Sequence, residues 1–457
     1  MKKKNICFVS NFQKTFFFEK IALILHSHEI NIFWFCFDYD TYSYLKKNFS
    51  ENNILLLSKK ITKKQQKTIN DFKLNELIYG DRFLKHQTDW AYDYLISIQN
   101  PIKKFIEDKN INFIFGEVTH AHEILIHRLV NEFRKEKTHY LHPQSVRIPN
   151  GRFFFLEDEF QSKIFKDKLT CNTNWEQDYN VIKPVRPKRV AQVDQSVNRE
   201  LSLLGKLGRV KRFFTNENLY KDLPSQLDNK FKRSLNAVKE EINKISYSFI
   251  NTNDITVLEE KKFVFYTLHM QPEASVDVVG VYYENQLNNI KNIWRVLPHD
   301  WYIVVKEHSN AIGNRPYNFF SEFLNIRNSI LLNEKCDSHK IIDKSQAMFT
   351  VSGTIAYEAA LKGKPAFTFS SIFFNKLKNC THISLTTFRQ IKNFKQLLKM
   401  AEVENETKLS IEEFSKYLYQ RSYEGIVDAP VKSIDWLDTN NIVKVSESFL
   451  KFLRLHG

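Results

Sequence analysis

Strand-like and helix-like segments alternate along this 457-residue chain, and they form two separate series. Each short apolar segment is followed by a longer amphipathic one, which is the pattern of βαβ units and a parallel sheet. Two Rossmann-like α/β domains are therefore the predicted architecture. The first series has strands at 5–10, 31–37, 53–57, 111–115 and 138–142, with helices at 14–27, 40–48, 62–78, 87–108 and 120–136. The second has strands at 262–266, 301–305, 329–332, 347–351 and 365–369, with helices at 282–296, 316–325, 338–345 and 354–362.

The domain boundaries follow from where this alternation weakens. A chain of 457 residues is too long for one ordinary core. Pro184 and Pro187 interrupt the pattern, and a polar, basic stretch follows them. Apolar residues return at helical spacing between 440 and 455. We therefore predict an N-terminal Rossmann-like domain at 1–190, a helical connection at 191–255, a C-terminal Rossmann-like domain at 256–435 and a closing helix at 436–457.

Composition excludes several classes of protein. Hydrophobic residues make up 42% of the chain and aromatic residues 14%, so a disordered protein is excluded. Eleven Gly and eleven Pro are few for this length, which argues against a loop-rich all-β fold. The five cysteines are scattered and contain no CxxC pair, so we expect neither a disulfide framework nor a zinc site. We expect no bound metal and no required cofactor.

The charge points to an acidic partner without naming it. The chain carries 67 basic and 52 acidic residues, a net charge of +15. A nucleic acid, an anionic membrane or a phosphorylated substrate would each fit. Basic residues are not interleaved with aromatic ones as in nucleic-acid-binding proteins, so we expect no nucleic-acid partner. The dense basic stretches at 183–189 and 206–212 would suit a membrane surface.

The first residues predict a cytoplasmic protein. Basic residues 2–4 are followed by an apolar run of only Ile6 to Val9, which is too short for a signal peptide. No stretch approaches the roughly 18 consecutive apolar residues of a membrane span. The expected location is the cytoplasm, at most peripheral to the inner face of the membrane.

Two strand ends in the second series have the residues of a phosphate pocket. Lys306 and His308 follow the strand at 301–305, and they point to the same side because strand side chains alternate. Ser352, Gly353 and Thr354 follow the strand at 347–351 and open a helix. Helix N-termini at the carboxyl end of a parallel sheet bind anions through free N–H groups and the helix dipole. A surface lysine, a satisfied histidine and an ordinary capped helix would explain the same residues without a ligand.

Glu358 extends this pocket by one helical turn. It lies four residues after Thr354, on the same helical face, where a carboxylate can accept hydrogen bonds from ribose hydroxyls. These residues therefore predict that the ligand of the pocket is a nucleotide.

The region from Tyr266 to Pro365 is similar to the C-terminal half of bacterial capsule and surface-polysaccharide glycosyltransferases. The similarity covers about 100 residues and rests on Lys306-Glu307-His308, Ser352-Gly353-Thr354 and Gly363-Lys364-Pro365. More remotely, it extends to Kdo and sialic acid transferases and to CDP-glycerol phosphotransferases. The resemblance implies a GT-B architecture, in which two Rossmann-like domains face a cleft and these residues hold the donor nucleotide. Ser309 stands where the family has the proline of a His-Pro element.

Three carboxylates are candidate catalytic residues. Glu117 follows the strand at 111–115, where it could act as general base on an acceptor hydroxyl or as a nucleophile in a retaining reaction. Glu273 and Asp277 follow the first strand of the second series, in a loop that would line the cleft of a two-domain transferase. Gln271 in the same loop is a candidate substrate ligand. A proline-initiated turn with a helix cap is the alternative for this loop.

Two arginines flank a predicted Pro-Asn-Gly turn. Arg147 and Arg152 would suit a carboxylate or phosphate of the substrate, since guanidinium binds such groups in a bidentate manner. Structural packing on the phenylalanines at 153–155 is the alternative.

The leading functional hypothesis is a glycosyltransferase that moves a sugar from a nucleotide-activated donor to a surface polysaccharide or lipopolysaccharide acceptor. A CMP-linked acidic sugar is one candidate donor, and a glycan or lipid-linked glycan is the expected acceptor. A CDP-glycerol-type phosphotransferase, a UDP-sugar epimerase and a basic nucleic-acid-binding protein are the alternatives.

Overall fold

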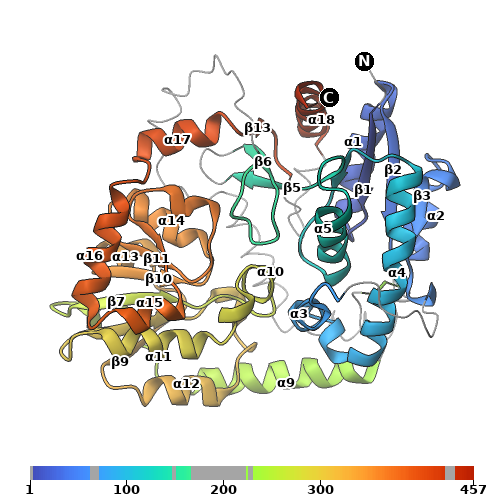
Figure 1. Ribbon diagram of the computed structural model, residues 1–457. Helices are drawn as coiled ribbons and strands as arrows, with labels where there is room; N and C mark the ends of the chain where they lie inside the picture. The colour runs from blue at the N-terminus through green and yellow to red at the C-terminus, as the bar shows by residue number, and fades with distance from the viewer. Residues whose placement is uncertain are drawn as a thin grey trace. The chain divides into compact units, whose positions relative to one another are not determined.

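A computed structural model describes residues 4–61, 71–146, 151–165, 223–224, 230–427 and 438–456. These residues form two compact α/β units. Unit 1 lies within Met1–Glu159, Lys163–Asp228 and Tyr417–Gly457, and unit 2 within Phe160–Ser162 and Asn229–Lys416. Each unit is described by itself below (Figure 1).

Unit 1 is built on a seven-stranded sheet in the order β13-β6-β5-β4-β1-β2-β3. The strands from β3 to β5 pair in parallel, whereas β6 and β13 add an antiparallel edge. Its strands are β1 (Asn5–Val9), β2 (Asn31–Cys36), β3 (Ile54–Leu56), β4 (Phe113–Phe115), β5 (His139–Val146), β6 (Arg152–Leu156) and β13 (Tyr423–Glu424). Its helices are α1 (Lys14–Ser27), α2 (Tyr39–Leu45), α3 (Leu74–Gly80), α4 (Thr88–Asp108), α5 (Ala121–Phe133) and α18 (Thr439–Leu455).

Both faces of the unit 1 sheet are covered by helices. On one face, Phe8 and Trp34 pack with α1 and α18. On the other face, Phe33 and Phe35 contact Phe105 of α4. Strands buried on both sides have to be apolar throughout, which is why β1 and β2 show continuous rather than alternating hydrophobicity.

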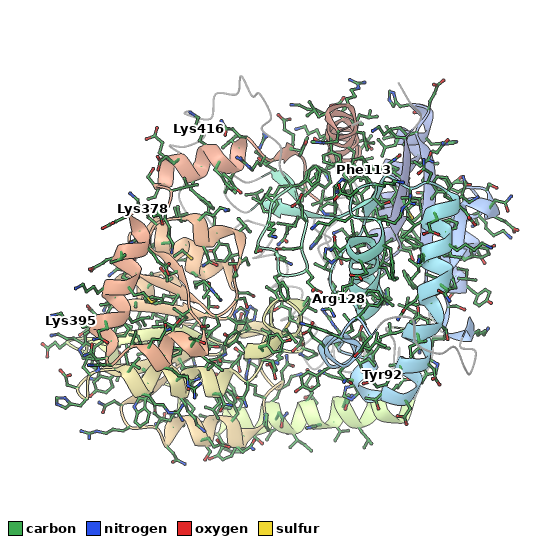
Figure 2. All side chains as sticks on the ribbon, in the orientation of Figure 1. Tyr92, Phe113, Arg128, Lys378, Lys395 and Lys416 are labelled. Carbon is green, nitrogen blue, oxygen red and sulfur yellow. The ribbon has the colours of Figure 1, made fainter. Side chains whose placement is uncertain are left out.

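Helix α18 completes the core of unit 1 after the chain has passed through unit 2. Phe449 lies 4.8 Å from Phe115, and Phe452 lies 4.5 Å from Phe155, between ring centroids. Figure 2 shows Phe113 of the same core, whose ring is 5.2 Å from that of Phe452. The predicted closing helix is therefore present as α18, and it belongs to unit 1.

Unit 2 has a six-stranded, fully parallel sheet in the order β12-β11-β10-β7-β8-β9. Its strands are β7 (Phe263–Thr267), β8 (Tyr302–Lys306), β9 (Ser329–Leu332), β10 (Ala347–Thr350), β11 (Ala366–Thr368) and β12 (Cys380–His382). Its helices are α9 (Lys230–Ser248), α10 (Ala274–Asp277), α11 (Gln286–Val296), α12 (Tyr317–Leu324), α13 (Ser338–Lys344), α14 (Thr354–Leu361), α15 (Leu385–Gln390) and α16 (Phe394–Asn405), followed by α17 (Ile411–Tyr419).

The prediction of two Rossmann-like α/β domains is confirmed by these two sheets. The GT-B cleft between the domains stays a prediction. The predicted boundaries at 190 and 435 fall outside the described residues. Helix α9, predicted as part of the connection at 191–255, belongs to unit 2.

Candidate functional site

The candidate nucleotide site lies at the carboxyl edge of the unit 2 sheet. Strands β10, β7 and β8 are direct neighbours, so the loops that follow them start side by side. Ligands bind at this edge in open α/β sheets. The predicted residues of the phosphate pocket are therefore brought to one edge of one sheet.

His269 connects the loops after β7 and β10. Its Nε2 accepts a hydrogen bond from the backbone N–H of Val351 at 3.3 Å and lies 2.6 Å from the Thr350 hydroxyl oxygen. Burial lowers the pKa of His269 to about 3, and the charges of His308 and Arg315 act in the same direction. The imidazole is therefore neutral at physiological pH, and Nε2 is an acceptor. A second link joins the same loops, because the Ser352 hydroxyl donates to the Ser275 carbonyl at 2.6 Å.

Helix α14 begins at this edge without a side-chain cap. The Gly353 N–H bonds to the Thr350 hydroxyl, and the Ala356 N–H bonds to the Gly353 carbonyl. The backbone N–H groups of Thr354 and Ile355 have no partner among the described residues. Helix N-termini with such donors are known to bind anions, and the predicted phosphate contacts of Ser352, Gly353 and Thr354 stay a prediction.

Gly353 is required here by a close approach. A Cβ atom at this position would lie 2.7 Å from the Thr350 hydroxyl oxygen and 3.1 Å from the His269 ring. Its φ of −69° is open to any residue, so space and not backbone conformation selects glycine. A bare backbone also lets a ligand approach the start of α14 closely.

Lys306 is the last residue of β8 and His308 follows the strand, and each has contacts within the protein. The Lys306 ammonium donates to the carbonyls of Glu334 and Cys336 at 3.4 and 3.0 Å, in the loop after β9. The His308 Nδ1 accepts from the Asn310 N–H at 3.2 Å and caps a short 3₁₀ turn. Their predicted role as phosphate ligands stays a prediction.

A buried ion pair fixes the base of this loop. The Arg315 guanidinium donates to both carboxylate oxygens of Glu307 at 2.6 Å and also to the His269 carbonyl. The two side chains are only 7% and 1% exposed. Burial raises the pKa of Glu307, although Arg315 acts in the opposite direction. The charge pair therefore lies within the loop after β8, and the bond from Arg315 to the His269 carbonyl links this loop to the one after β7.

The loop after β7 contains a closed hydrogen-bond cluster. Asp277 accepts from the Gln271 amide and from the Glu273 N–H, both at 2.9 Å. The Ser275 hydroxyl donates to the Glu273 carboxylate at 2.9 Å. These bonds explain how the loop keeps its shape, but α10 begins after Glu273 without a side-chain cap, whereas the capped-turn alternative had placed a cap at Ser275. Catalytic roles for Glu273 and Asp277 and a ligand role for Gln271 stay predictions.

Glu358 lies on α14, and its carboxylate is 3.4 Å from the His339 Nε2 of α13. Its side chain is 17% exposed. The predicted contact with ribose hydroxyls is untested.

In unit 1, Glu117 follows β4 and is partly exposed, with 23% of its side chain accessible. The Lys14 ammonium is 2.5 Å from one carboxylate oxygen, and the Asn11 amide donates to the other at 2.9 Å. Burial opposes ionisation, yet Lys14 and His142 lower the pKa of Glu117 below its usual range. Glu117 is thus held in place and ionised at neutral pH.

Gly116 allows the backbone to turn directly before Glu117. A Cβ atom there would overlap the Tyr140 hydroxyl and would lie 2.8 Å from the Val9 side chain. The Tyr140 hydroxyl donates to the Glu117 carbonyl at 2.5 Å. The position of Glu117 therefore depends on a small residue before it.

At the start of helix α5, carboxylates of the protein accept hydrogen bonds from the backbone N–H groups. The buried Glu123 accepts from the N–H groups of Thr119 and His120, both at 3.0 Å. Asp81 accepts from the Ala121 N–H at 3.0 Å and faces the His120 imidazole at 3.5 Å. Burial would raise the pKa of Asp81, but its hydrogen bonds and His120 lower it far below its usual range. The N–H groups of Thr119, His120 and Ala121 at the start of α5 are therefore bound by carboxylates of the protein itself.

Arg152 contacts the antiparallel edge of unit 1. Its guanidinium donates to the Ser422 hydroxyl and carbonyl at 2.8 and 2.6 Å and stacks on Tyr419 at 5.0 Å. These contacts join β6 to β13, while the packing alternative had placed Arg152 on the phenylalanines of β6. Substrate binding by Arg152 stays a prediction, and Arg147 lies outside the described residues.

Five residues of the two sites were missed in the sequence. They interact across long sequence separations, and none belongs to a short motif. The nearest signal was position, since Asn11 and Lys14 follow the first strand and His269 follows the first strand of the second series. The five are Asn11, Lys14, Asp81, His269 and Arg315.

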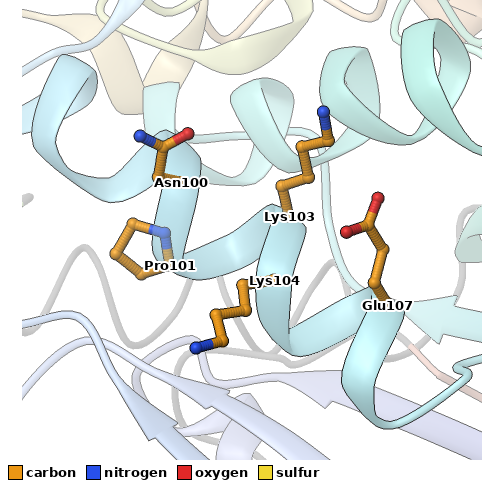
Figure 3. A pocket seen from close by; sticks show the side chains of 5 residues that line it. All are labelled: Asn100, Pro101, Lys103, Lys104 and Glu107. Atoms are coloured by element: carbon orange, nitrogen blue, oxygen red, sulfur yellow. The ribbon is translucent and has the colours of Figure 1, made fainter.

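In the described part of the chain, no three His, Cys, Asp or Glu side chains converge as metal ligands do. Figure 3 shows a shallow depression on α4 around Pro101, lined also by Asn100, Lys103, Lys104 and Glu107. It contains none of the predicted site residues.

No helix among the described residues is long and apolar enough to cross a membrane.

No known family profile matches the chain, and no curated protein matches it. Solved structures to which this chain is similar include the β-Kdo 2,7 transferase of KpsC from Thermosulfurimonas dismutans, at 11% identity and a TM-score of 0.36, covering 78% of this chain and 90% of that one. The β-Kdo 2,4 transferase of the same KpsC is similar at 10% identity and a TM-score of 0.32, covering 69% and 82%. UDP-GlcNAc 2-epimerase from Neisseria meningitidis is similar at 12% identity and a TM-score of 0.24, covering 98% and 100%.

Proposed function

We propose that this protein is a glycosyltransferase that binds a nucleotide-activated sugar at unit 2 and transfers the sugar to a glycan or lipid-linked glycan acceptor. The observation that carries the proposal is the uncapped start of α14, with open N–H groups on Thr354 and Ile355 at the carboxyl edge of a parallel sheet. Unit 1 supports the same assignment by contrast. There, Glu123 and Asp81 accept hydrogen bonds from the backbone N–H groups at the start of the corresponding helix, α5.

The chemistry requires negative charge to be stabilised at this point. The acceptor oxygen forms a bond to the anomeric carbon while the bond from that carbon to the nucleotide phosphate breaks. The electron pair of the broken bond leaves with the phosphate, so donors aimed at it stabilise the transition state. The N–H groups at the start of α14 and the Thr354 hydroxyl would do this, with Lys306 and His308 as further candidates.

The acceptor proton needs a base, and Glu117 is the candidate. Its lowered pKa keeps it ionised at neutral pH, which both the base and the nucleophile role require. The same lowered pKa makes it a weaker base than a carboxylate tuned to neutral pH. Glutamine can neither accept the acceptor proton nor act as the nucleophile. Because the proposed nucleotide site lies in unit 2, we expect Glu117→Gln to abolish transfer and to leave nucleotide binding unchanged.

The test of the donor site is Thr354→Pro. Proline fits the first position of a helix, and the extended backbone of Gly353 (φ −69°, ψ 139°) suits the residue before a proline. The substitution therefore removes one open N–H and one hydroxyl while α14 remains folded. The matched control is Thr439→Pro, an exposed threonine at the same position of α18 in unit 1.

Binding of CMP, CDP, UDP and GDP and of their sugar conjugates is measured by calorimetry and thermal shift. We expect at least one nucleotide to bind, with about tenfold weaker affinity in Thr354→Pro, as the loss of roughly 1.4 kcal/mol would give, and no change in Thr439→Pro. If no nucleotide binds, or if both variants bind equally well, the donor site is wrong. Phosphate in the polymer product would favour the phosphotransferase, and sugar conversion without an acceptor would favour the epimerase.

A further inference from the structure

Helix α9, labelled in Figure 1, carries an apolar stripe whose side chains are exposed in the described part of the protein. The side chains recur at intervals of three and four residues and therefore lie on one helical face. No other described helix has more than two exposed large apolar side chains. The α9 stripe consists of Leu235, Val238, Ile242 and Ile245, which are 52%, 56%, 56% and 59% exposed, and Phe249, which is 81% exposed, follows directly after the helix.

The stripe is distinct from the face by which α9 packs on unit 2. On that face the buried Asn243 amide donates to the Gly313 carbonyl at 3.0 Å. Tyr247 packs on Phe320 at 5.1 Å between ring centroids, and its hydroxyl donates to Glu334 at 3.3 Å. The C-terminal half of α9 is thus anchored to unit 2 with its polar and aromatic face. The apolar stripe remains directed away from that core.

The charge of α9 indicates what covers the stripe. The helix contains five basic residues and two acidic ones, Glu240 and Glu241, both of which pair with Lys244, and the whole chain has a net charge of +15. Lys239 is exposed next to Val238, within the stripe's own length. A second copy of α9 would bring like net charges together, which opposes pairing. An anionic lipid surface instead combines headgroups that attract the lysines with an apolar layer that accepts the stripe.

We propose that the α9 stripe binds the surface of an anionic membrane. The four apolar side chains of the stripe and Phe249 enter the boundary between the headgroups and the acyl chains, and the exposed Lys239 contacts the lipid phosphates. This surface does not depend on the proposed transfer reaction, and vesicle binding is measured without any nucleotide. Failure of one proposal therefore leaves the other standing.

The test compares binding of the full chain to phosphatidylglycerol-containing and to pure phosphatidylcholine vesicles by co-sedimentation. The stripe variant is Ile242→Ser/Ile245→Ser, and the matched control is Leu385→Ser/Val403→Ser, which removes two apolar side chains of similar exposure from α15 and α16. All four side chains are exposed, so circular dichroism should show unchanged folding.

We expect binding to the anionic vesicles that weakens with added salt, falls about tenfold or more in the stripe variant and is unchanged in the control. Absent vesicle binding, or equal binding by the stripe variant and the control, would overturn the proposal. A dimer in light scattering that the stripe variant dissociates would overturn it too, because a second copy would then cover the stripe.

Discussion

Replacing Arg315 by Met tests how the candidate nucleotide site is held together. The variant removes the two 2.6 Å hydrogen bonds to Glu307 and the bond to the His269 carbonyl, and it leaves a carboxylate that is only 1% exposed without its counter-charge. Removing one partner of a buried ion pair costs about 3–5 kcal/mol. For a unit of this size the loss corresponds to a fall of roughly 6–20 °C in the unfolding temperature, at about 2–4 °C per kcal/mol.

The matched control is Lys291→Met. Lys291 pairs with Glu322 at 3.2 Å in the same unit, but the two side chains are 33% and 54% exposed. Surface pairs contribute about 0–1 kcal/mol, so this variant should unfold within a few degrees of the parent. The double variant Glu307→Gln/Arg315→Met removes both buried charges, and it should recover much of the stability that Arg315→Met loses.

The pH dependence gives an independent check. The pKa of Glu307 is raised in the folded protein, so the folded state holds its proton more tightly than the unfolded state does. Stability therefore falls as pH rises from the ordinary pKa of a glutamate, about 4.3, through the raised one. Removing Arg315 raises that pKa further, so the loss in Arg315→Met should be largest near pH 8 and smaller near pH 5. A loss under about 1 kcal/mol at pH 8, or one that grows on acidification, would refute the reasoning.

The remaining predictions concern unit 1. Gly116→Ala should destabilise the protein by about 1–3 kcal/mol, because the added Cβ displaces the Tyr140 hydroxyl, and it should lower transfer by moving Glu117; urea unfolding and activity measure the two effects. Asp81→Asn should lower the pKa of His120, which Asp81 raises against the effect of burial, and NMR titration measures this shift. In the parent, the low pKa of Asp81 gives stability that is lost as pH falls below about 4, whereas the raised pKa of His120 gives stability that is lost as pH rises above about 6.5. The unfolding temperature of the variant should therefore depend less on pH, both below about pH 4 and above about pH 6.5. The same pH dependence in the variant as in the parent would contradict the prediction.

The sequence predicted the parallel parts of both units closely because their signal is local. The strand predicted at 329–332 is β9 with the same limits, and the helix predicted at 14–27 is α1. Apolar runs and helical periodicity are properties of short windows, so long-range contacts were not needed to find these elements.

The antiparallel edge of unit 1 could not be predicted in this way. Strand β6 pairs with Tyr423 and Glu424, about 270 residues later in the chain, and no local pattern records that pairing. The same limit applies to the site. Ser352, Gly353 and Thr354 form a recognisable turn, whereas the links of Lys14 to Glu117 and of Arg315 to Glu307 exist only in the folded chain.

The place of α18 has a consequence for how the protein is made. The ribosome synthesises all of unit 2 before residues 438–456, yet the rings of Phe449 and Phe452 belong to the core beneath β1 and β4. Domains usually fold in order as they emerge, the N-terminal one first. Unit 1 therefore starts to form first but can be completed only last, and one apolar face of its sheet lacks the cover of α18, with α1 already present, while unit 2 folds. A chaperone that shields this face during translation would have its greatest effect on unit 1.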